Sequence, residues 1–150
     1  MTGKLSRFRA LSWSERYLLV SSMLLLPLFW IALRAWGLSR FQAWLNRSSV
    51  VAGASPGADR LAAIAALVNI AGRYSPGPST CLTRSLLLLW LMRRRGVCGE
   101  LRVGVRLVED RLDAHAWVEY QGKPINDVWD VSERYATFDG PLSPGSFSSP

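Results

Sequence analysis

Three residues in the second half of the chain could together perform nucleophilic chemistry: Cys81, His115 and Asp127. Cys81 directly follows a proline-rich turn and should occupy the first turn of a helix. Free backbone N–H groups and the helix dipole stabilise a thiolate there. His115 lies in one strand pattern and Asp127 in the next, so antiparallel pairing can bring the carboxylate to the imidazole. A thiol attacker, a base and a group that orients the base are the components of nucleophilic catalysis by cysteine.

Other residues near Cys81 are weaker candidates for the nucleophile. Cys98 sits in a glycine-bounded turn rather than at a helix start, and we interpret it as structural. Ser79 and Ser85 flank Cys81, but Ser79, like Thr80, suits a helix cap, and no G-x-S-x-G motif is present.

The strand around His115 carries further polar and aromatic side chains. Alternation places Asp113 and Trp117 on the face of His115. Asp113 has the wrong position along the strand to orient the ring. Trp117 either lines a substrate groove beside the site or is a core aromatic. Asp130 is the alternative to Asp127 if the register of the last strand differs.

Composition excludes several kinds of cofactor site. With two cysteines and one histidine, the chain cannot build a four-cysteine zinc site or any site with two imidazoles. Cys81, Cys98 and His115 have irregular spacing for a metal. The sequence has no glycine-rich phosphate loop and no dinucleotide fingerprint. We therefore expect no metal and no other cofactor.

Charge is distributed unevenly along the chain, whose formal net charge is +7. Residues 1–99 carry 13 basic and 2 acidic side chains, whereas residues 100–150 carry 5 basic and 9 acidic ones. A basic half indicates either an acidic partner surface or ordinary solvated faces. The aromatic residues are not interleaved with the basic ones, and no nucleic-acid motif is present, so we expect no nucleic-acid partner.

The N-terminal part is basic over its first 16 residues and then uncharged from Tyr17 to Leu33. This run of 17 residues would span only about 26 Å as a helix, which is short for a membrane crossing. Pro27 lies at its middle, and no small-residue cleavage site follows it. We favour a helix, kinked or restarted at Pro27, that packs on the domain or on a partner. A membrane segment and a signal peptide are the alternatives.

The remaining sequence predicts helices followed by strands. Helices are expected at 38–47, from Asp59 as cap to Arg73, and from Cys81 to Arg95, with a small-residue linker at 48–57. The last of these helices is apolar all round from Leu86 to Met92, so it should be central. Strands are expected at 101–107, 112–120 and 125–129, followed by a disordered tail. This pattern predicts an α+β fold with an antiparallel meander.

From about residue 60 to 138 the sequence resembles the transglutaminase-like cysteine protease superfamily and, within it, the lasso-peptide leader peptidases. The matching segments are Cys81-Leu-Thr-Arg-Ser-Leu, Arg95-Gly96, Leu101-Arg-Val-Gly-Val105, Ala114-His-Ala-Trp-Val-Glu119, Gly122-Lys-Pro-Ile125 and Asp127. The resemblance implies a papain/transglutaminase-like fold, in which a helix bearing Cys81 packs on a small antiparallel sheet bearing His115 and Asp127.

The same resemblance implies a reaction and its partners. A peptide bond between the leader and core of a ribosomally made precursor peptide would be hydrolysed, and a separate lasso cyclase would then form a macrolactam. Cys81 would attack the carbonyl, His115 would transfer protons, and Asp127 would orient the imidazole. The first 57 residues do not look like the leader-binding module that some members carry. We therefore expect a separate leader-binding protein as a partner.

These inferences divide the chain into three parts: an apolar helical segment at 1–57, the cysteine protease domain at 58–139 and a flexible tail at 140–150. The apolar segment should pack on the protease domain or on a partner. We expect a cytoplasmic protein, with membrane association as the alternative. Rival functions are another transglutaminase-like amidohydrolase or acyltransferase, and a non-catalytic membrane-associated assembly protein.

Overall fold

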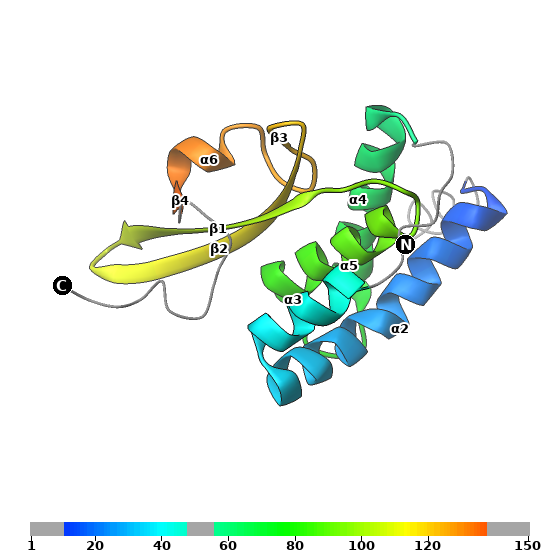
Figure 1. Ribbon diagram of the computed structural model, residues 1–150, viewed down its shortest axis with the longest axis horizontal. Helices are drawn as coiled ribbons and strands as arrows, with labels where there is room; N and C mark the ends of the chain where they lie inside the picture. The colour runs from blue at the N-terminus through cyan, green and yellow to red at the C-terminus, as the bar shows by residue number, and fades with distance from the viewer. Residues whose placement is uncertain (1–10, 48–55, 138–150) are drawn as a thin grey trace, which may run out of the picture.

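Helices and strands separate along the chain and also in space. The computed structural model describes residues 11–47 and 56–137, and a bundle of helices lies beside a curled antiparallel sheet in it (Figure 1). The elements are α2 (Trp13–Trp36), α3 (Leu38–Arg47), α4 (Ala58–Tyr74), α5 (Cys81–Arg93), β1 (Glu100–Val108), β2 (Arg111–Tyr120), β3 (Lys123–Pro124), α6 (Val131–Arg134) and β4 (Ala136–Thr137). The predicted α+β class is therefore confirmed, and the architecture is consistent with a transglutaminase-like fold.

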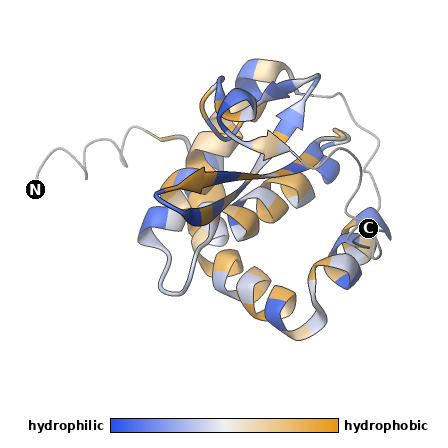
Figure 2. Ribbon diagram, turned by 90° about the vertical axis from the view of Figure 1, so that its left-hand side faces the viewer, coloured by the Kyte–Doolittle hydropathy of each residue, from blue (hydrophilic) through white to orange (hydrophobic). Residues whose placement is uncertain are grey.

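The sheet has the strand order β3-β2-β1-β4 and is antiparallel throughout. Its centre is the β1–β2 hairpin, in which Gly104 pairs with His115. The hairpin turn uses Glu109 and Asp110, both with positive φ, which is the geometry that matches the twist of the two strands. Blue and orange bands alternate along this hairpin in Figure 2, as the period of two in a strand leads one to expect.

The third strand is much shorter than the sequence predicts. We expected it over 125–129, but β3 covers only Lys123–Pro124, and Asp127 lies in the bend that follows. The reason is that a side chain replaces the backbone as hydrogen-bond partner of the neighbouring strand β2. Ile125 still donates its N–H to the Val118 carbonyl, but the Val118 N–H is bound at 2.8 Å by the side-chain oxygen of Asn126. The backbone of this segment is thus free to turn toward the helices.

Helix α5 is the central element of the bundle. Thr80 is its N-cap and forms a capping box with Thr83, so Cys81 is its first residue. Its buried residues include Leu86–Leu89, Leu91 and Met92, as their apolar pattern predicts. The helix ends at Arg93, two residues before the predicted end, and Gly96 with φ 76° follows in the turn.

Helix α4 begins two residues earlier than predicted. Its N-cap is Gly57 rather than Asp59, and no side chain makes a cap hydrogen bond there. Asp59 instead lies in the first turn, where a carboxylate still interacts favourably with the helix dipole.

Helix α2 is continuous through Pro27. The alternative that the helix restarts at Pro27 is therefore wrong. A proline cannot donate a hydrogen bond to the carbonyl four residues earlier, which here belongs to Met23. The Ser75 hydroxyl donates to this carbonyl at 3.4 Å from the loop between α4 and α5. Gly77 of the same loop lies so close to the Pro27 ring that an added Cβ would come within 3.0 Å of it. The loop therefore packs on α2 at the point where Pro27 interrupts the hydrogen bonding of that helix.

One hydrophobic core joins the helices and the sheet. It includes Leu26 and Phe29 of α2, Leu61 of α4, Leu87 of α5 and Val118 of β2. Helix α2 packs against both α4 and α5, so core contacts cross the expected boundary between residues 57 and 58. The three-part division stays a prediction. The tail at 140–150 and most of the linker at 48–57 lie outside the described residues.

Candidate active site

His115 and Asp127 form a hydrogen-bonded pair. The carboxylate Oδ2 of Asp127 contacts Nε2 of His115, and both side chains are 24% exposed. The other carboxylate oxygen accepts a hydrogen bond of 2.8 Å from the Val128 N–H. Both carboxylate oxygens of Asp127 therefore have a hydrogen-bond partner, and the imidazole of His115 is bound to the carboxylate through Nε2. The nitrogen that remains for proton transfer is Nδ1.

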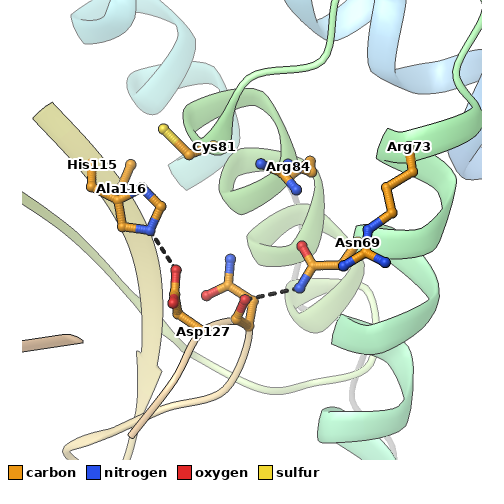
Figure 3. Close-up of a pocket in the computed structure, with 8 residues that line it drawn as sticks. Asn69, Arg73, Cys81, Arg84, His115, Ala116 and Asp127 are labelled. Carbon is orange, nitrogen blue, oxygen red and sulfur yellow. Dashed lines mark hydrogen bonds and ion pairs between the residues drawn. The ribbon is translucent and has the colours of Figure 1, made fainter. Parts of the chain in front are cut away.

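Cys81 lies at the start of α5 and borders the same pocket as this pair. In Figure 3 the imidazole is seen between Cys81 and Asp127. The cysteine is a free thiol and partly buried. Within the described chain no hydrogen bond joins its sulfur to the ring. Catalytic contacts of this kind often tighten only when substrate is bound.

The pocket between α4, α5 and β2 is small. It has a volume of about 100 Å³, room for a few water molecules or for one peptide group. The residues that line it are Asn69, Arg73, Cys81, Arg84, His115, Ala116, Asn126 and Asp127. A peptide chain would therefore place only its reacting bond in the pocket and extend over the surface on either side.

The helix start supplies hydrogen-bond donors at this pocket. The first N–H groups of a helix have no acceptor within the helix. The Thr80 hydroxyl accepts the N–H of Thr83 at 3.2 Å, whereas the side-chain cap does not use the N–H groups of Cys81 and Leu82. These two donors lie beside the sulfur and can bind a developing oxyanion.

A network of amide and hydroxyl groups fixes the segment that carries Asp127. Asn126 accepts from the Val118 N–H and donates at 3.0 Å to the Ser85 hydroxyl. Ser85 in turn donates to the Ala116 carbonyl at 3.1 Å. On the other side, the Asn69 amide donates to the backbone carbonyl of Asn126 at 2.8 Å (Figure 3). The bend is thus tied to α4, α5 and β2 at once.

Sequence reasoning missed Asn69 and Asn126. An asparagine immediately before the expected orienting acid was a local signal, because side-chain amides often stabilise bends by bonding to the backbone. Asn69 offers no such signal, since its partner is 57 residues away.

Two aromatic rings, those of Trp117 and Tyr135, lie close to the imidazole of His115. The ring centroid of His115 lies 6.2 Å from Trp117 and 5.2 Å from Tyr135. Trp117 is fully buried, donates its indole N–H to Glu119, and is not among the pocket residues. This placement favours the core-aromatic interpretation of Trp117. A contact between Trp117 and substrate stays a prediction.

Asp113 holds Tyr135 in place rather than orienting His115. It accepts hydrogen bonds from Arg106 at 2.8 Å and from the Tyr135 hydroxyl at 3.0 Å. The Arg106 bond, followed by the Tyr135 bond, holds the pKa of the Asp113 carboxyl below its usual range. Burial and the same contact raise the pKa of Tyr135. Gly104 makes this packing feasible, because a Cβ there would lie 2.7 Å from the Tyr135 Cβ.

The other candidates lie apart from the cysteine or serve a structural purpose. Asp130 is the N-cap of α6, without a side-chain cap bond. Cys98 is an exposed free thiol in the turn before β1. Ser85 is fully buried in the network around Asn126. Within the ranges 11–47 and 56–137, no group of three or more metal-ligating side chains is gathered closely enough to hold a metal ion.

Two arginines give the pocket a positive rim. Arg73 comes from the last turn of α4, and Arg84 donates through Nε to the Thr80 carbonyl at 3.3 Å. Neither forms a salt bridge to an acidic side chain in the part of the chain that the structure describes. The rim therefore attracts electron-rich or acidic groups of a ligand.

The comparison with protein families gives a match. The model of the transglutaminase-like superfamily matches residues 25–138, which is most of the chain and includes Cys81, His115 and Asp127. The chain belongs to the transglutaminase-like superfamily. Proteins of this superfamily are typically cysteine hydrolases, so a cysteine amidohydrolase or protease type of activity is indicated. Among curated proteins and solved structures, none matches the chain significantly.

Proposed function

We propose that this superfamily member is a cysteine peptidase that removes the leader from a lasso-peptide precursor. The observation that carries the proposal is the gathering of Cys81, His115 and Asp127 at one pocket, with the imidazole bound to the carboxylate. The narrower substrate assignment rests on the sequence segments that resemble leader peptidases, above all the strand from Ala114 to Glu119.

The reaction proceeds by acylation and hydrolysis. Nδ1 of His115 takes the thiol proton as Cys81 attacks the scissile carbonyl carbon, and the N–H groups of Cys81 and Leu82 bind the oxyanion. The C–N bond breaks as the imidazolium protonates the leaving amine of the core peptide. A water molecule, deprotonated by His115, then attacks the thioester, and the leader leaves with a new carboxylate. Asp127 holds the ring in one orientation and stabilises its charged form throughout.

The shape of the pocket supports dependence on a partner. A cavity that accepts little more than one peptide bond offers few contacts by which to select a substrate. A separate leader-binding protein would provide the missing affinity by presenting the precursor to the cysteine. The positive rim of Arg73 and Arg84 would favour an acidic or electron-rich group next to the cut. A lasso cyclase would then act on the released core.

The experiment that tests this function is a cleavage assay with mass spectrometry. The full-length protein is mixed with a candidate precursor, with and without the leader-binding partner. Two products whose masses together equal the precursor plus one water are expected, formed much faster with the partner. Hydrolysis of unrelated small amides without any partner would favour a different amidohydrolase, and transfer to an added amine would favour an acyltransferase. Absence of all three activities would support a non-catalytic function.

A further inference from the structure

Helix α2 has two apolar faces, and only one of them packs against other elements in the part of the chain that the structure describes. Its buried residues are Leu18, Leu19, Ser22, Leu26 and Phe29. At about 100° per residue, they lie on one side of the helix. This side packs against α4 and α5.

The opposite side of α2 exposes large apolar side chains to solvent. They are Trp13 (84% exposed), Tyr17 (78%), Val20 (47%), Leu24 (61%), Leu28 (58%) and Ile31 (55%). Their spacing of three or four residues places all six within a sector of about 80°, roughly opposite the buried face. We call these six residues the outer stripe. A row of this kind is a large exposed apolar surface for a soluble domain, and such surfaces mark contacts with a partner or a membrane.

The two charged side chains of α2 that border the outer stripe are both positive. Arg16 and Arg34 project from the same edge of the stripe by helix geometry. In residues 1–47 the chain has seven basic side chains and one acidic one, Glu15. Glu15 is already used in the capping box with Ser12. Apolar side chains flanked by cations, with Trp and Tyr at one end, fit an anionic membrane surface.

The helix is long and apolar enough to span a bilayer by length and composition alone. Its packing argues for a different arrangement. Spanning would pull Leu26 and Phe29, which are 0% and 6% exposed, out of the shared core. Lying in the membrane surface buries only the outer stripe and leaves that core intact.

We propose that the outer stripe of α2 docks the protein onto an anionic lipid membrane, with the helix lying in the membrane surface. A second copy of the chain fits less well, because pairing of two outer stripes would bring their Arg16 and Arg34 edges together, and Glu15, the acidic side chain of α2, is engaged in the capping box. The pocket residues come from α4, α5, β2 and the bend at Asp127, and none from α2. The docked protein therefore keeps its cysteine site open.

Vesicle co-sedimentation of the full-length protein tests the proposal. One set of vesicles is pure phosphatidylcholine, and the other also contains phosphatidylglycerol. We expect preferential binding to the anionic vesicles, weakened by added salt because charge pairs are screened. Replacing Leu24→Glu together with Leu28→Glu should lower the fraction bound about tenfold or more.

A matched control comes from the sheet. Leu107 and Leu112 are 67% and 73% exposed and face each other at the end of the β1–β2 hairpin. Leu107→Glu with Leu112→Glu changes the charge equally but leaves the outer stripe intact, so vesicle binding should persist. Circular dichroism checks that both double variants fold.

Several results would overturn the proposal. The first is the absence of vesicle binding by the wild type, and the second is equal loss of binding in the two double variants. Retention on membranes after carbonate extraction would show a spanning helix instead. Self-association that disappears in the Leu24→Glu and Leu28→Glu variant would show that a second copy covers the stripe. An acidic protein that binds the stripe while vesicles do not would identify a protein partner. The readouts do not involve peptide cleavage, so they are independent of the proposed function.

Discussion

The hydrogen bond between Asp127 and Nε2 determines which nitrogen of His115 can act as the base. With Nε2 bound to the carboxylate, the proton exchange with a thiol falls to Nδ1. Cys81 is the proposed nucleophile, and it lies in the first turn of α5. The partial positive charge of the helix N-terminus there stabilises a thiolate. The two effects are separable, and each makes a prediction.

The first prediction concerns the two cysteines. Cys81→Ala should abolish precursor cleavage, because the chain's other thiol, Cys98, lies away from the start of α5. Cys98→Ala is the matched control, since it removes an exposed thiol from a turn and should keep most of the activity. Mass spectrometry of the cleavage products measures both. Cleavage that survives in Cys81→Ala would exclude the cysteine mechanism.

The second prediction concerns the orienting acid. Asp127→Asn should lower kcat by about 100-fold or more, because an amide no longer stabilises the imidazolium or fixes its tautomer. The variant should still fold, since Asn keeps the shape of the side chain. Asp130→Asn, in the cap of α6, should change the rate little. A larger loss at Asp130 than at Asp127 would identify Asp130 as the orienting group.

At the scale of elements, the site depends on a bend that replaces a strand. Polar contacts to α4, α5 and β2 hold this bend, and an aromatic layer from β2 and the Tyr135 region lies close to the imidazole. The element that carries Asp127 is therefore positioned by side chains rather than by a strand ladder.

The third prediction tests this network. Asn126→Ala should destabilise the protein by about 1–3 kcal/mol, because the Val118 N–H and the Ser85 hydroxyl each lose a partner in a buried setting. Cleavage should also slow, since Asp127 is the next residue. Urea unfolding and the cleavage rate provide the two readouts. Gln121→Ala, in an exposed turn, should affect neither. An Asn126→Ala protein with unchanged stability and full activity would show that Asn126 does not hold the bend that carries Asp127.

The fourth prediction concerns how the contribution of Asp113 to the free energy of unfolding depends on pH. The pKa of Asp113 is lowered in the folded state, so its ion pair stabilises the fold above the unfolded pKa of about 3.9. This contribution is lost as pH falls through the lower folded pKa. The stability difference between the wild type and Asp113→Asn should therefore be constant near neutral pH and shrink below about pH 4. Urea unfolding across that range measures it.

Glu109→Gln is the control for this titration, because Glu109 lies in the hairpin turn and no salt bridge connects it to the described residues. Its stability difference from the wild type is measured over the same range for comparison. A difference for Asp113→Asn that grows as pH falls would have the opposite sign and would refute the assigned shift.

At the scale of the whole molecule, α2 belongs to the core that supports the site. Leu26 is 0% exposed and packs in the same cluster as the buried residues of α5. The loop that leads into α5 also rests on α2, through Ser75 and Gly77 near Pro27. Loss of α2 should therefore unfold the site and not merely remove an appendage.

The fifth prediction uses three positions of this helix. Leu26→Ala should cost about 2–5 kcal/mol, because it leaves a cavity in the core. Leu24→Ala, on the exposed side, should change stability by less than about 0.5 kcal/mol. Ser22→Ala should be neutral or stabilising, since the buried Ser22 hydroxyl has no partner within residues 11–47 and 56–137. Thermal unfolding measures all three, and a silent Leu26→Ala would show that α2 is not part of the core.

Local chemistry and periodicity determined much of this protein from the sequence alone. Alternation predicted β1 and β2, and it placed His115 and Trp117 on one face of β2, where their rings stack. The proline-rich turn and Thr80 predicted the start of α5 at Cys81. These signals are local, because a strand repeats every two residues and a helix cap acts within one turn. The catalytic roles of the three site residues stay predictions for the cleavage assay.

Tertiary structure alone decided the features that depend on distant partners. Asn126 ends the third strand because its side-chain oxygen accepts the Val118 N–H in place of a strand partner, while its NH2 group donates to the Ser85 hydroxyl. Arg73 reaches the pocket only through the packing of α4 beside α5. Hydropathy shows that α2 is apolar, but it cannot say which face is covered. The buried face is set by where α4 and α5 lie, and the outer stripe stays exposed because no described element packs over it. Such contacts join residues far apart in the chain, so no local pattern encodes them.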